Sequence, residues 1–144
     1  MTDNRLALSL LIIRLSAGAF LGVWASLKFF RPEWMVNVFR GTYKLDFITQ
    51  DFAFAVGALQ MLIVVLFIIG FQRTIFYALV ALMHSAGVIG SLPSLLFKFT
   101  NYPQNLLWTS VPTLGALVAL FLLRKHDVFT IDGWRRRTST AERP

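Results

Sequence analysis

Four polar side chains lie inside apolar stretches of this 144-residue sequence, where their chemistry is unusual for the surroundings. Arg14 lies within the run Leu8–Gly22, Gln60 and His84 lie in two later apolar runs, and Thr113 lies in a fourth. An arginine in hydrocarbon costs several kcal/mol of free energy, so its side chain should face protein rather than lipid. These residues are therefore candidates for a polar site between helices.

Small residues accompany these side chains at helical spacing. Arg14, Gly18 and Gly22 follow one another at four-residue steps, and Gly18-x-x-x-Gly22 is typical of a helix face that packs closely against another helix. Gln60 and His84 each lie one turn from a glycine. At a rise of about 1.5 Å per residue, the four polar side chains lie roughly 12 to 17 Å from one membrane face. We therefore expect them to form one polar layer.

A slot with one cation, one imidazole and one amide fits a lipophilic molecule with a polar head, such as a quinone. Arg14 or His84 would hydrogen-bond its carbonyl oxygens, and the imidazole would transfer protons. Arg14, Gln60 and Thr113 are thus candidate ligand-binding residues, and His84 is the candidate catalytic residue. The alternative is that such residues only form hydrogen bonds between helices, which is the simpler interpretation for Gln60 and Thr113.

Composition argues against other cofactors. The sequence contains no cysteine, which excludes disulfides, thiolate metal sites and iron–sulfur ligation. His126, the only other histidine, lies some 20 Å from His84 by the same rise, so we expect no intrinsic bis-histidine haem and no self-contained metal site. The glycines stand at helix-packing spacing and do not form a phosphate-binding loop.

The elements that would position these residues are four apolar runs, each long enough to cross about 30 Å of hydrocarbon. The second and third are joined by a short link and must form an antiparallel hairpin, and Pro112 should kink the fourth. The sequence therefore predicts an all-α membrane protein with a bundle of four transmembrane helices. The expected spans are about Leu6–Phe30, Phe52–Phe71, Thr74–Leu92 and Leu106–Leu123.

Charge predicts the orientation and the surroundings of this bundle. The side that holds both termini collects more arginine and lysine than the other side, so both termini are expected in the cytoplasm. The formal net charge of +7 points to anionic lipid headgroups as partners, and no nucleic-acid-binding motif accompanies it. The expected location is the cytoplasmic membrane of a bacterium or archaeon.

Two segments outside the spans carry their own signals. In the first outer loop, Pro32 can begin a short helix and Gly41 can end it, with several apolar residues on one face, which predicts an interfacial helix. Residues 1–126 are expected to form the membrane domain. Residues 127–144 are expected to form a basic cytoplasmic tail that anchors on the inner leaflet and then becomes disordered.

The stretch RLSAGAFLGVWASLKFF resembles the first-span signature of DoxX-like membrane proteins. That signature has an arginine, a glycine one turn later, a Trp-His-Gly-type element and a lysine, matched here by Arg14, Gly18, Trp24 and Lys28. The stretch GALQMLIVVLFIIGFQRTIFYALVALM resembles the glycine, acidic residue and apolar hairpin of the family's second span. Trp24, as part of this signature, joins the candidate ligand-binding residues.

This chain departs from the family pattern at two places. Ala25 and Ser26 stand where many relatives carry His-Gly, and Gln60 stands where an acidic residue is common. A proton-carrying role of those residues would here be lost or moved to His84. The resemblance implies a four-helix inner-membrane protein, and members have been associated with quinone-reducing sulfur oxidation, terminal oxidase complexes and membrane-bound oxidative-stress assemblies.

Three functions follow from these patterns. The first is a small inner-membrane subunit of, or accessory to, a quinone-linked oxidoreductase, with a redox partner protein on the outer face. The second is a non-catalytic assembly or anchoring protein, and the third is a small-solute carrier, which the lack of an inverted repeat disfavours. The sequence leaves open whether the chain is itself catalytic and whether it forms a homo-oligomer.

Overall fold

The protein is described here by a computed structural model of residues 4–102 and 104–141, and this part of the chain contains helices and no strand. Three long helices are α1 (Asn4–Phe30), α3 (Gln50–Ile69) and α4 (Arg73–Gly90). A fourth long stretch is the 3₁₀ helix η1 (Gln104–Thr109) continued by α6 (Ser110–Leu122). The shorter helices are α2 (Pro32–Tyr43), α5 (Leu92–Phe97) and α7 (Ile131–Ala141).

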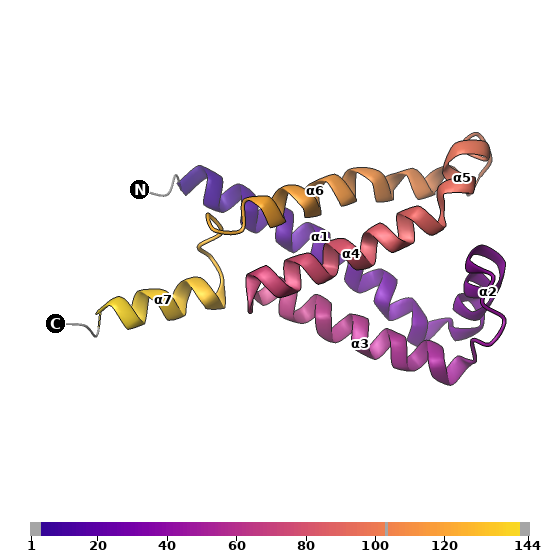
Figure 1. Ribbon diagram of the computed structural model, residues 1–144, viewed down its shortest axis with the longest axis horizontal. Helices are drawn as coiled ribbons and strands as arrows, with labels where there is room; N and C mark the ends of the chain where they lie inside the picture. Colours follow the sequence, from indigo (N-terminus) through magenta and orange to yellow (C-terminus); the bar gives the residue numbers. More distant parts are fainter. Residues whose placement is uncertain (1–3, 103, 142–144) are drawn as a thin grey trace.

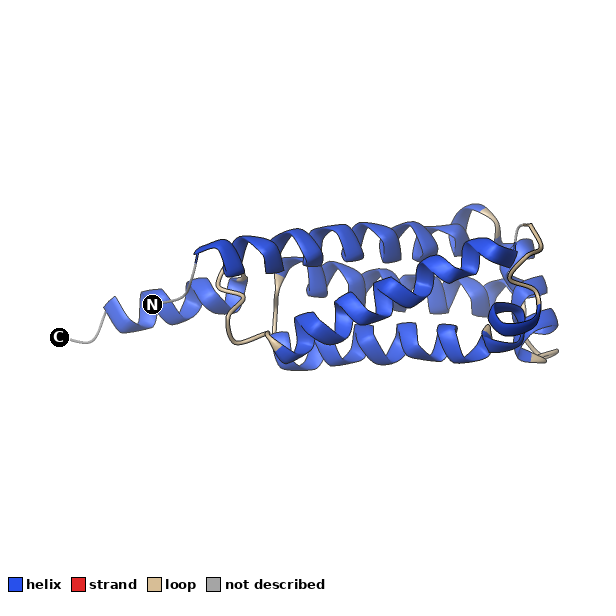
Figure 2. Cartoon of the chain, turned by 90° about the horizontal axis from the view of Figure 1, so that it is seen from above, coloured by secondary structure: helices blue, strands red, loops and turns tan. Residues whose placement is uncertain are grey.

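The long helices form a four-helix bundle (Figure 1, Figure 2). Their order around the bundle is α1, α3, α4 and α6, since each contacts the next and α6 contacts α1 again. The beginning of α1 and the whole of α7 lie at one end, called here the α7 end, whereas α2 and α5 lie at the opposite end, called the α2 end (Figure 1). Both described ends of the chain therefore lie on the same side of the bundle.

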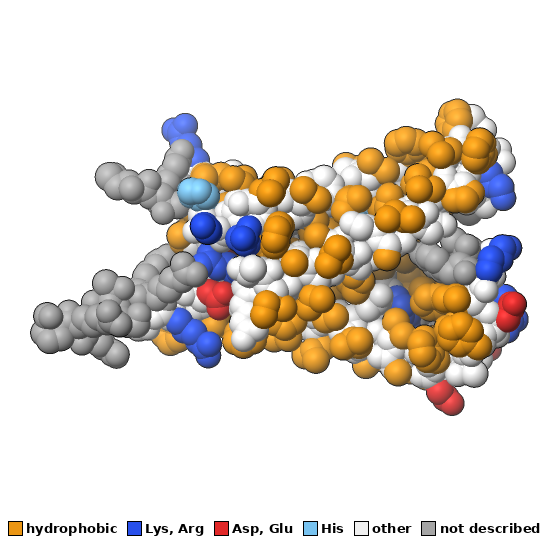
Figure 3. Space-filling view, in the orientation of Figure 1, with side chains coloured by type: hydrophobic (Ala, Val, Ile, Leu, Met, Phe, Trp, Pro, Cys, Tyr) orange, Lys and Arg blue, Asp and Glu red, His pale blue; other side chains and the backbone are white. Residues whose placement is uncertain are grey.

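Four helical stretches are long and apolar enough to cross a membrane: Asn4–Phe30, Gln50–Ile69, Arg73–Gly90 and Gln104–Leu122. Many large apolar side chains on these stretches are exposed on the outside of the bundle. Apolar side chains cover the middle of the surface, and most of the basic and acidic ones lie toward the two ends (Figure 3). The prediction of four spanning helices is confirmed, with each end within one turn of its expected place, and it indicates an integral membrane protein.

The hairpin of α3 and α4 is fixed by local signals at its two ends. The Thr49 side chain accepts a hydrogen bond of 3.3 Å from the Phe52 backbone N–H and so begins α3. Gly70 ends α3 with a φ of 69°, a left-handed conformation that glycine adopts without a steric penalty. Only Phe71 and Gln72 separate Gly70 from the start of α4, so the predicted antiparallel hairpin is confirmed.

Three predicted details differ from the structure. The helix that begins at Pro32 continues through Gly41 and ends before Lys44, whose φ of 59° stops it. The fourth span changes from 3₁₀ to α geometry before Pro112, which lies in the first turn of α6, where the missing N–H needs no partner. The tail after Thr130 is helical as α7, whereas disorder was predicted for its end; residues 142–144 lie outside the described part.

The main hydrophobic core lies between the four long helices. It is built from side chains of all four long helices that are at most 6% exposed. Its members are Leu10, Ala17, Leu21, Val64, Phe67, Tyr77, Val80, Leu117 and Leu120. The cavity described next lies toward the α2 end, where further apolar side chains such as Ala25, Met35 and Leu95 are also buried.

Candidate functional site

One face of α1 carries two buried basic residues, Arg14 and Lys28. Its other buried residues are apolar or small and recur every three or four positions: Ala7, Leu10, Ala17, Gly18, Leu21 and Ala25. Arg14 is 2% exposed and Lys28 is 5% exposed. Lys28 follows Arg14 by fourteen residues, so the two lie about 21 Å apart along the helix axis, one toward each end of the bundle.

Toward the α7 end, Arg14 belongs to a buried ion-pair cluster, which we call the Arg14 cluster and which also contains Tyr77 and Asp127. Arg14 Nη1 donates to Asp127 Oδ2 at 2.5 Å and to the Tyr77 hydroxyl at 3.0 Å. The Tyr77 hydroxyl donates in turn to the same carboxylate oxygen at 2.7 Å. Arg14 Nη2 donates to the Phe129 carbonyl. The guanidinium is thus neutralised by a carboxylate from beyond the fourth span.

Asp127 is held in place by a second arginine and by the start of α7. Arg73 Nη1 donates to the Arg124 carbonyl at 2.8 Å and also to the Asp127 carbonyl. The Asp132 carboxylate accepts from the backbone N–H groups of Gln72 and Arg73 at 3.1 and 2.9 Å, and so caps α4, whose own N-cap side chain forms no such bond. The first residues of the predicted tail are therefore packed on the bundle.

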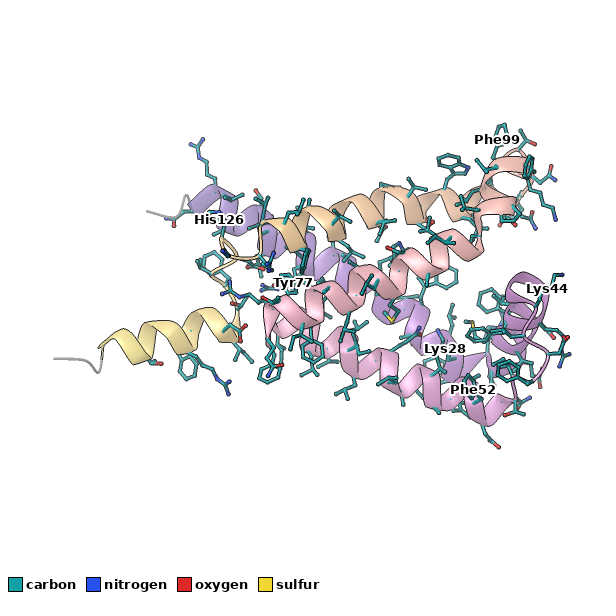
Figure 4. All side chains as sticks on the ribbon, viewed as in Figure 1. Lys28, Lys44, Phe52, Tyr77, Phe99 and His126 are labelled. Atoms are coloured by element: carbon teal, nitrogen blue, oxygen red, sulfur yellow. The ribbon has the colours of Figure 1, made fainter. Side chains whose placement is uncertain are left out.

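The Arg14 cluster has the properties of a structural element. Its two charges compensate each other, Asp127 is fully buried, and the cavity described below does not reach these residues. Among the described residues, only Arg14 Nε and Asp127 Oδ1 are buried here without a hydrogen-bond partner. Figure 4 shows Tyr77 in the part of the bundle toward the α7 end and Lys28 toward the other end.

Toward the α2 end, a cavity of about 590 Å³ lies between the helices, and we call it the Lys28 pocket. A volume of this size is typical of small-molecule sites. The surface is hollowed between α2 and α5 (Figure 3). The polar residues that line the Lys28 pocket are Lys28, Gln60, His84, Ser91, Ser94, Gln104, Thr109 and Ser110. The apolar and aromatic residues of the lining include Phe20, Leu21, Trp24, Trp34, Met83 and Leu107.

Lys28 is the most unusual residue of this pocket. Within the described residues, its Nζ donates one hydrogen bond, a long one of 3.4 Å to the Trp24 carbonyl. No Asp or Glu lines the pocket, and no ion pair of Lys28 occurs within the described part of the chain. The lysine stem is pressed against α3, because a Cβ at Gly57 would come within 2.8 Å of Lys28 Cβ. A buried ammonium thus faces a cavity without a protein counter-charge.

Aromatic rings form the wall beside Lys28. The Trp24 and Trp34 rings lie 6.1 Å apart between centroids, Phe20 lies 6.3 Å from Trp24, and His84 lies edge-on to Phe20 at 6.1 Å. His84 Nε2 lies 2.9 Å from the Ser110 carbonyl oxygen, which can only accept, so Nε2 carries the proton in this contact. This row of rings, formed by Phe20, Trp24, Trp34 and His84, offers flat apolar surfaces together with an imidazole, which suits a ring-shaped ligand.

The predicted site residues are divided between two places. Trp24, Gln60 and His84 line the Lys28 pocket together, whereas Arg14 and Thr113 do not. The expectation of a single polar layer is therefore wrong. Arg14 is engaged by the Arg14 cluster, and the Thr113 hydroxyl donates to the Thr109 carbonyl of its own helical stretch at 2.8 Å. The Gln60 amide is half-buried and forms no hydrogen bond within the described residues.

Sequence reasoning did not find Lys28 or Asp127 as site residues. Lys28 was predicted only as part of the family signature in the first span, yet it follows Arg14 by two heptads and thus lies on the same helix face. That spacing was a usable signal. Asp127 has no such signal, because it lies 113 residues from Arg14 in the sequence.

Neither the search for a metal site nor the comparison with known proteins indicates a function. Within the described ranges, no group of three or more histidine, aspartate or glutamate side chains is arranged to hold a metal ion. Figure 4 shows His126 at the α7 end, far from the Lys28 pocket. Comparison with protein-family models, curated proteins and solved structures gives no match. The chemistry of the pocket is therefore the basis for a functional proposal.

Proposed function

We propose that this chain is a small membrane subunit of a quinone-linked oxidoreductase, and that the Lys28 pocket holds the quinone head group. The supporting observation is the combination, in one cavity of about 590 Å³, of Lys28, Gln60 and His84 with a row of aromatic rings. Quinone carbonyl oxygens accept hydrogen bonds, which the ammonium and the amide donate. The aromatic wall covers the faces of the ring.

In this proposal the roles are redistributed relative to the sequence prediction. Lys28 orients the head group in place of Arg14, Gln60 adds a hydrogen bond, and His84 exchanges a proton with the reduced ring. The resemblance of the first two spans to DoxX-like proteins supports the same function. The electron donor or acceptor would be a partner protein, because the chain has no cysteine for thiol or iron–sulfur redox chemistry.

The orientation belongs to the same proposal. We place the α7 end in the cytoplasm, because it carries the excess of basic residues. Trp134 is 66% exposed on α7, and Arg135 follows it, so this helix suits the headgroup layer of an anionic leaflet. The pocket would then lie in the outer half of the bilayer, with α2 at the outer surface.

The test is the amount of quinone that the chain retains on purification in a mild detergent, measured by chromatography of an organic extract. Gln60→Leu and His84→Phe should each reduce the retained quinone roughly three- to tenfold, because a lost hydrogen bond costs about 1 kcal/mol. Thr113→Val is the matched control outside the pocket and should retain as much as the wild type. Equal retention by all four proteins would contradict the proposal.

A second candidate function, an assembly or anchoring subunit, is supported by exposed aromatic residues at the α2 end. Trp34 is 40% exposed and Phe47, in the segment between α2 and α3, is 70% exposed. Deletion of Glu33–Phe39 should then abolish association with partner subunits, and His84→Gln should leave the activity of the complex unchanged. Loss of activity in His84→Gln with an intact complex would refute this alternative.

A further inference from the structure

The charge balance of the Lys28 pocket points to the chemical class of its ligand. The Lys28 side chain is 95% withdrawn from solvent, and its one hydrogen bond, to the Trp24 carbonyl at 3.4 Å, leaves two N–H donors without a described acceptor. A buried ion is costly unless an opposite charge and further hydrogen bonds compensate it. None of the described side chains supplies this compensation to Lys28.

The acidic residues of the α2 end do not supply it. Glu33, Asp46 and Asp51 are exposed and do not line the pocket. Asp46 lies beside Arg40, at 3.7 Å between Nε and Oδ1. The neighbours of Lys28 in the pocket, such as Gln60, His84 and Ser94, are neutral donors or acceptors or can only add positive charge.

We propose that the ligand brings the missing negative charge, as an ionised oxygen on a flat apolar ring system, and that this oxygen pairs with Lys28 Nζ. A hydroxyquinone, whose ring hydroxyl is acidic, has this chemistry. The inference rests on the proposed function and narrows it to one ligand class. The row formed by Phe20, Trp24 and Trp34 favours a planar ring over a flexible acyl chain next to the ammonium.

The test compares two probes that share the ring system and differ at one oxygen, which is ionised in one probe and methylated in the other. The full chain, in a non-ionic detergent at neutral pH, is titrated calorimetrically with a 3-alkyl-2-hydroxy-1,4-naphthoquinone, which is anionic, and with its neutral 2-methoxy ether. We expect the wild type to bind the hydroxyquinone at least about tenfold more tightly, since a buried charge pair contributes strongly to affinity. Lys28→Met should remove this preference: the affinity for the ether should fall by about three- to tenfold, as for one lost hydrogen bond, and the affinity for the hydroxyquinone should fall by at least a further factor of about ten.

Control variants keep the test specific. Lys98→Met removes an exposed lysine at the same end of the bundle and should retain the wild-type preference. Circular dichroism checks the helical content of each variant. If Lys28→Met does not fold, Lys28→Gln, which keeps a polar end, replaces it.

Each outcome has a separate meaning. Equal binding of both probes by the wild type would overturn the inference and leave quinone binding in place. Binding of neither probe would overturn the proposed function as well. A third probe, palmitate, covers the other source of a carboxylate: Lys28-dependent binding of palmitate without binding of the hydroxyquinone would show a fatty-acid site and overturn both.

Discussion

The two buried cations of α1 lie on the same helix face, but the protein surrounds them in opposite ways. Arg14 contacts Asp127 at 2.5 Å and Tyr77 at 3.0 Å within a packed core. Lys28 has one hydrogen bond of 3.4 Å and faces an open cavity. A compensated charge holds elements together, whereas an uncompensated charge reduces stability and is available to a ligand. This difference supports a structural role for the α7 end and underlies our proposal that ligand binding occurs at the α2 end.

The largest effect is expected from Asp127→Asn. This isosteric change removes the only carboxylate on Arg14 in the described part of the chain and leaves a buried cation, so the free energy of unfolding should fall by about 3–5 kcal/mol. Denaturant titration in detergent micelles, followed by circular dichroism, measures it. The double variant Arg14→Met/Asp127→Leu should recover much of the loss, because it removes both charges together. A loss in the double variant as large as in the single one would contradict the charge argument.

Lys28→Met should instead increase the free energy of unfolding. Methionine has a similar length and no charge, so the ligand-free protein should gain about 1–3 kcal/mol of unfolding free energy, comparable to the cost of placing a lysine in a membrane helix. The same denaturant titration applies, on protein from which lipophilic molecules have first been extracted. A decrease in stability would show that Lys28 has a structural partner, and the contrast between the two ends would be lost.

Asp132→Ala examines the support around the Arg14 cluster. The Asp132 carboxylate accepts from the first N–H groups of α4 and lies 3.7 Å from Arg73 Nε. Its removal leaves these groups without an acceptor and should cost about 1–2 kcal/mol, as for a lost N-cap. Hydrogen exchange of the first turn of α4 should rise in this variant, and exchange in the first turn of α3 is the internal control. If the Arg73 backbone amide exchanged its hydrogen as slowly as in the wild type, the capping role of Asp132 would be refuted.

The smallest effect is expected for Arg40→Met at the α2 end. Arg40 and Asp46 lie 3.7 Å apart, and their side chains are 54% and 83% exposed, so solvent screens the pair. The unfolding free energy should change by less than about 1 kcal/mol. Comparison with Asp127→Asn in the same assay separates the effect of burial from the effect of charge pairing. If Arg40→Met lowered the unfolding free energy as much as Asp127→Asn, burial would not explain the difference between the two ion pairs.

The sequence predicted the spans better than the contacts between them. Hydropathy over about 20 residues determines where helices cross hydrocarbon, and Pro32 correctly marked the start of α2. Three of the predicted site residues line one pocket: Gln60 and His84, taken from the apolar runs, and Trp24, taken from the family signature. The depth of a residue in its span, however, says nothing about rotation around the helix axis. For this reason Arg14 and Thr113 were assigned to the same layer as His84.

The site residues that were not predicted make contacts that depend on the packing of distant segments and leave no local sequence pattern. Asp127 lies in a segment that composition alone assigns to a basic tail, and its pairing with Arg14 depends on how the end of α6 turns back toward α1. Lys28 was matched to the family signature but was given no role in the predicted site. Lys28 is buried because α3 packs closely against it, and Gly57 allows this close approach. Glycine spacing predicted close packing but not which side chain would occupy the space.

The long separation between Arg14 and Asp127 has a consequence for biosynthesis. The ribosome makes the arginine first and its counter-ion 113 residues later, so the first helix enters the bilayer with an unmatched guanidinium. A nascent chain that stops before residue 127 lacks the carboxylate that pairs with Arg14 in the described structure. Completion of translation is thereby coupled to closure of the bundle, and one late carboxylate reports that all four crossings have been made.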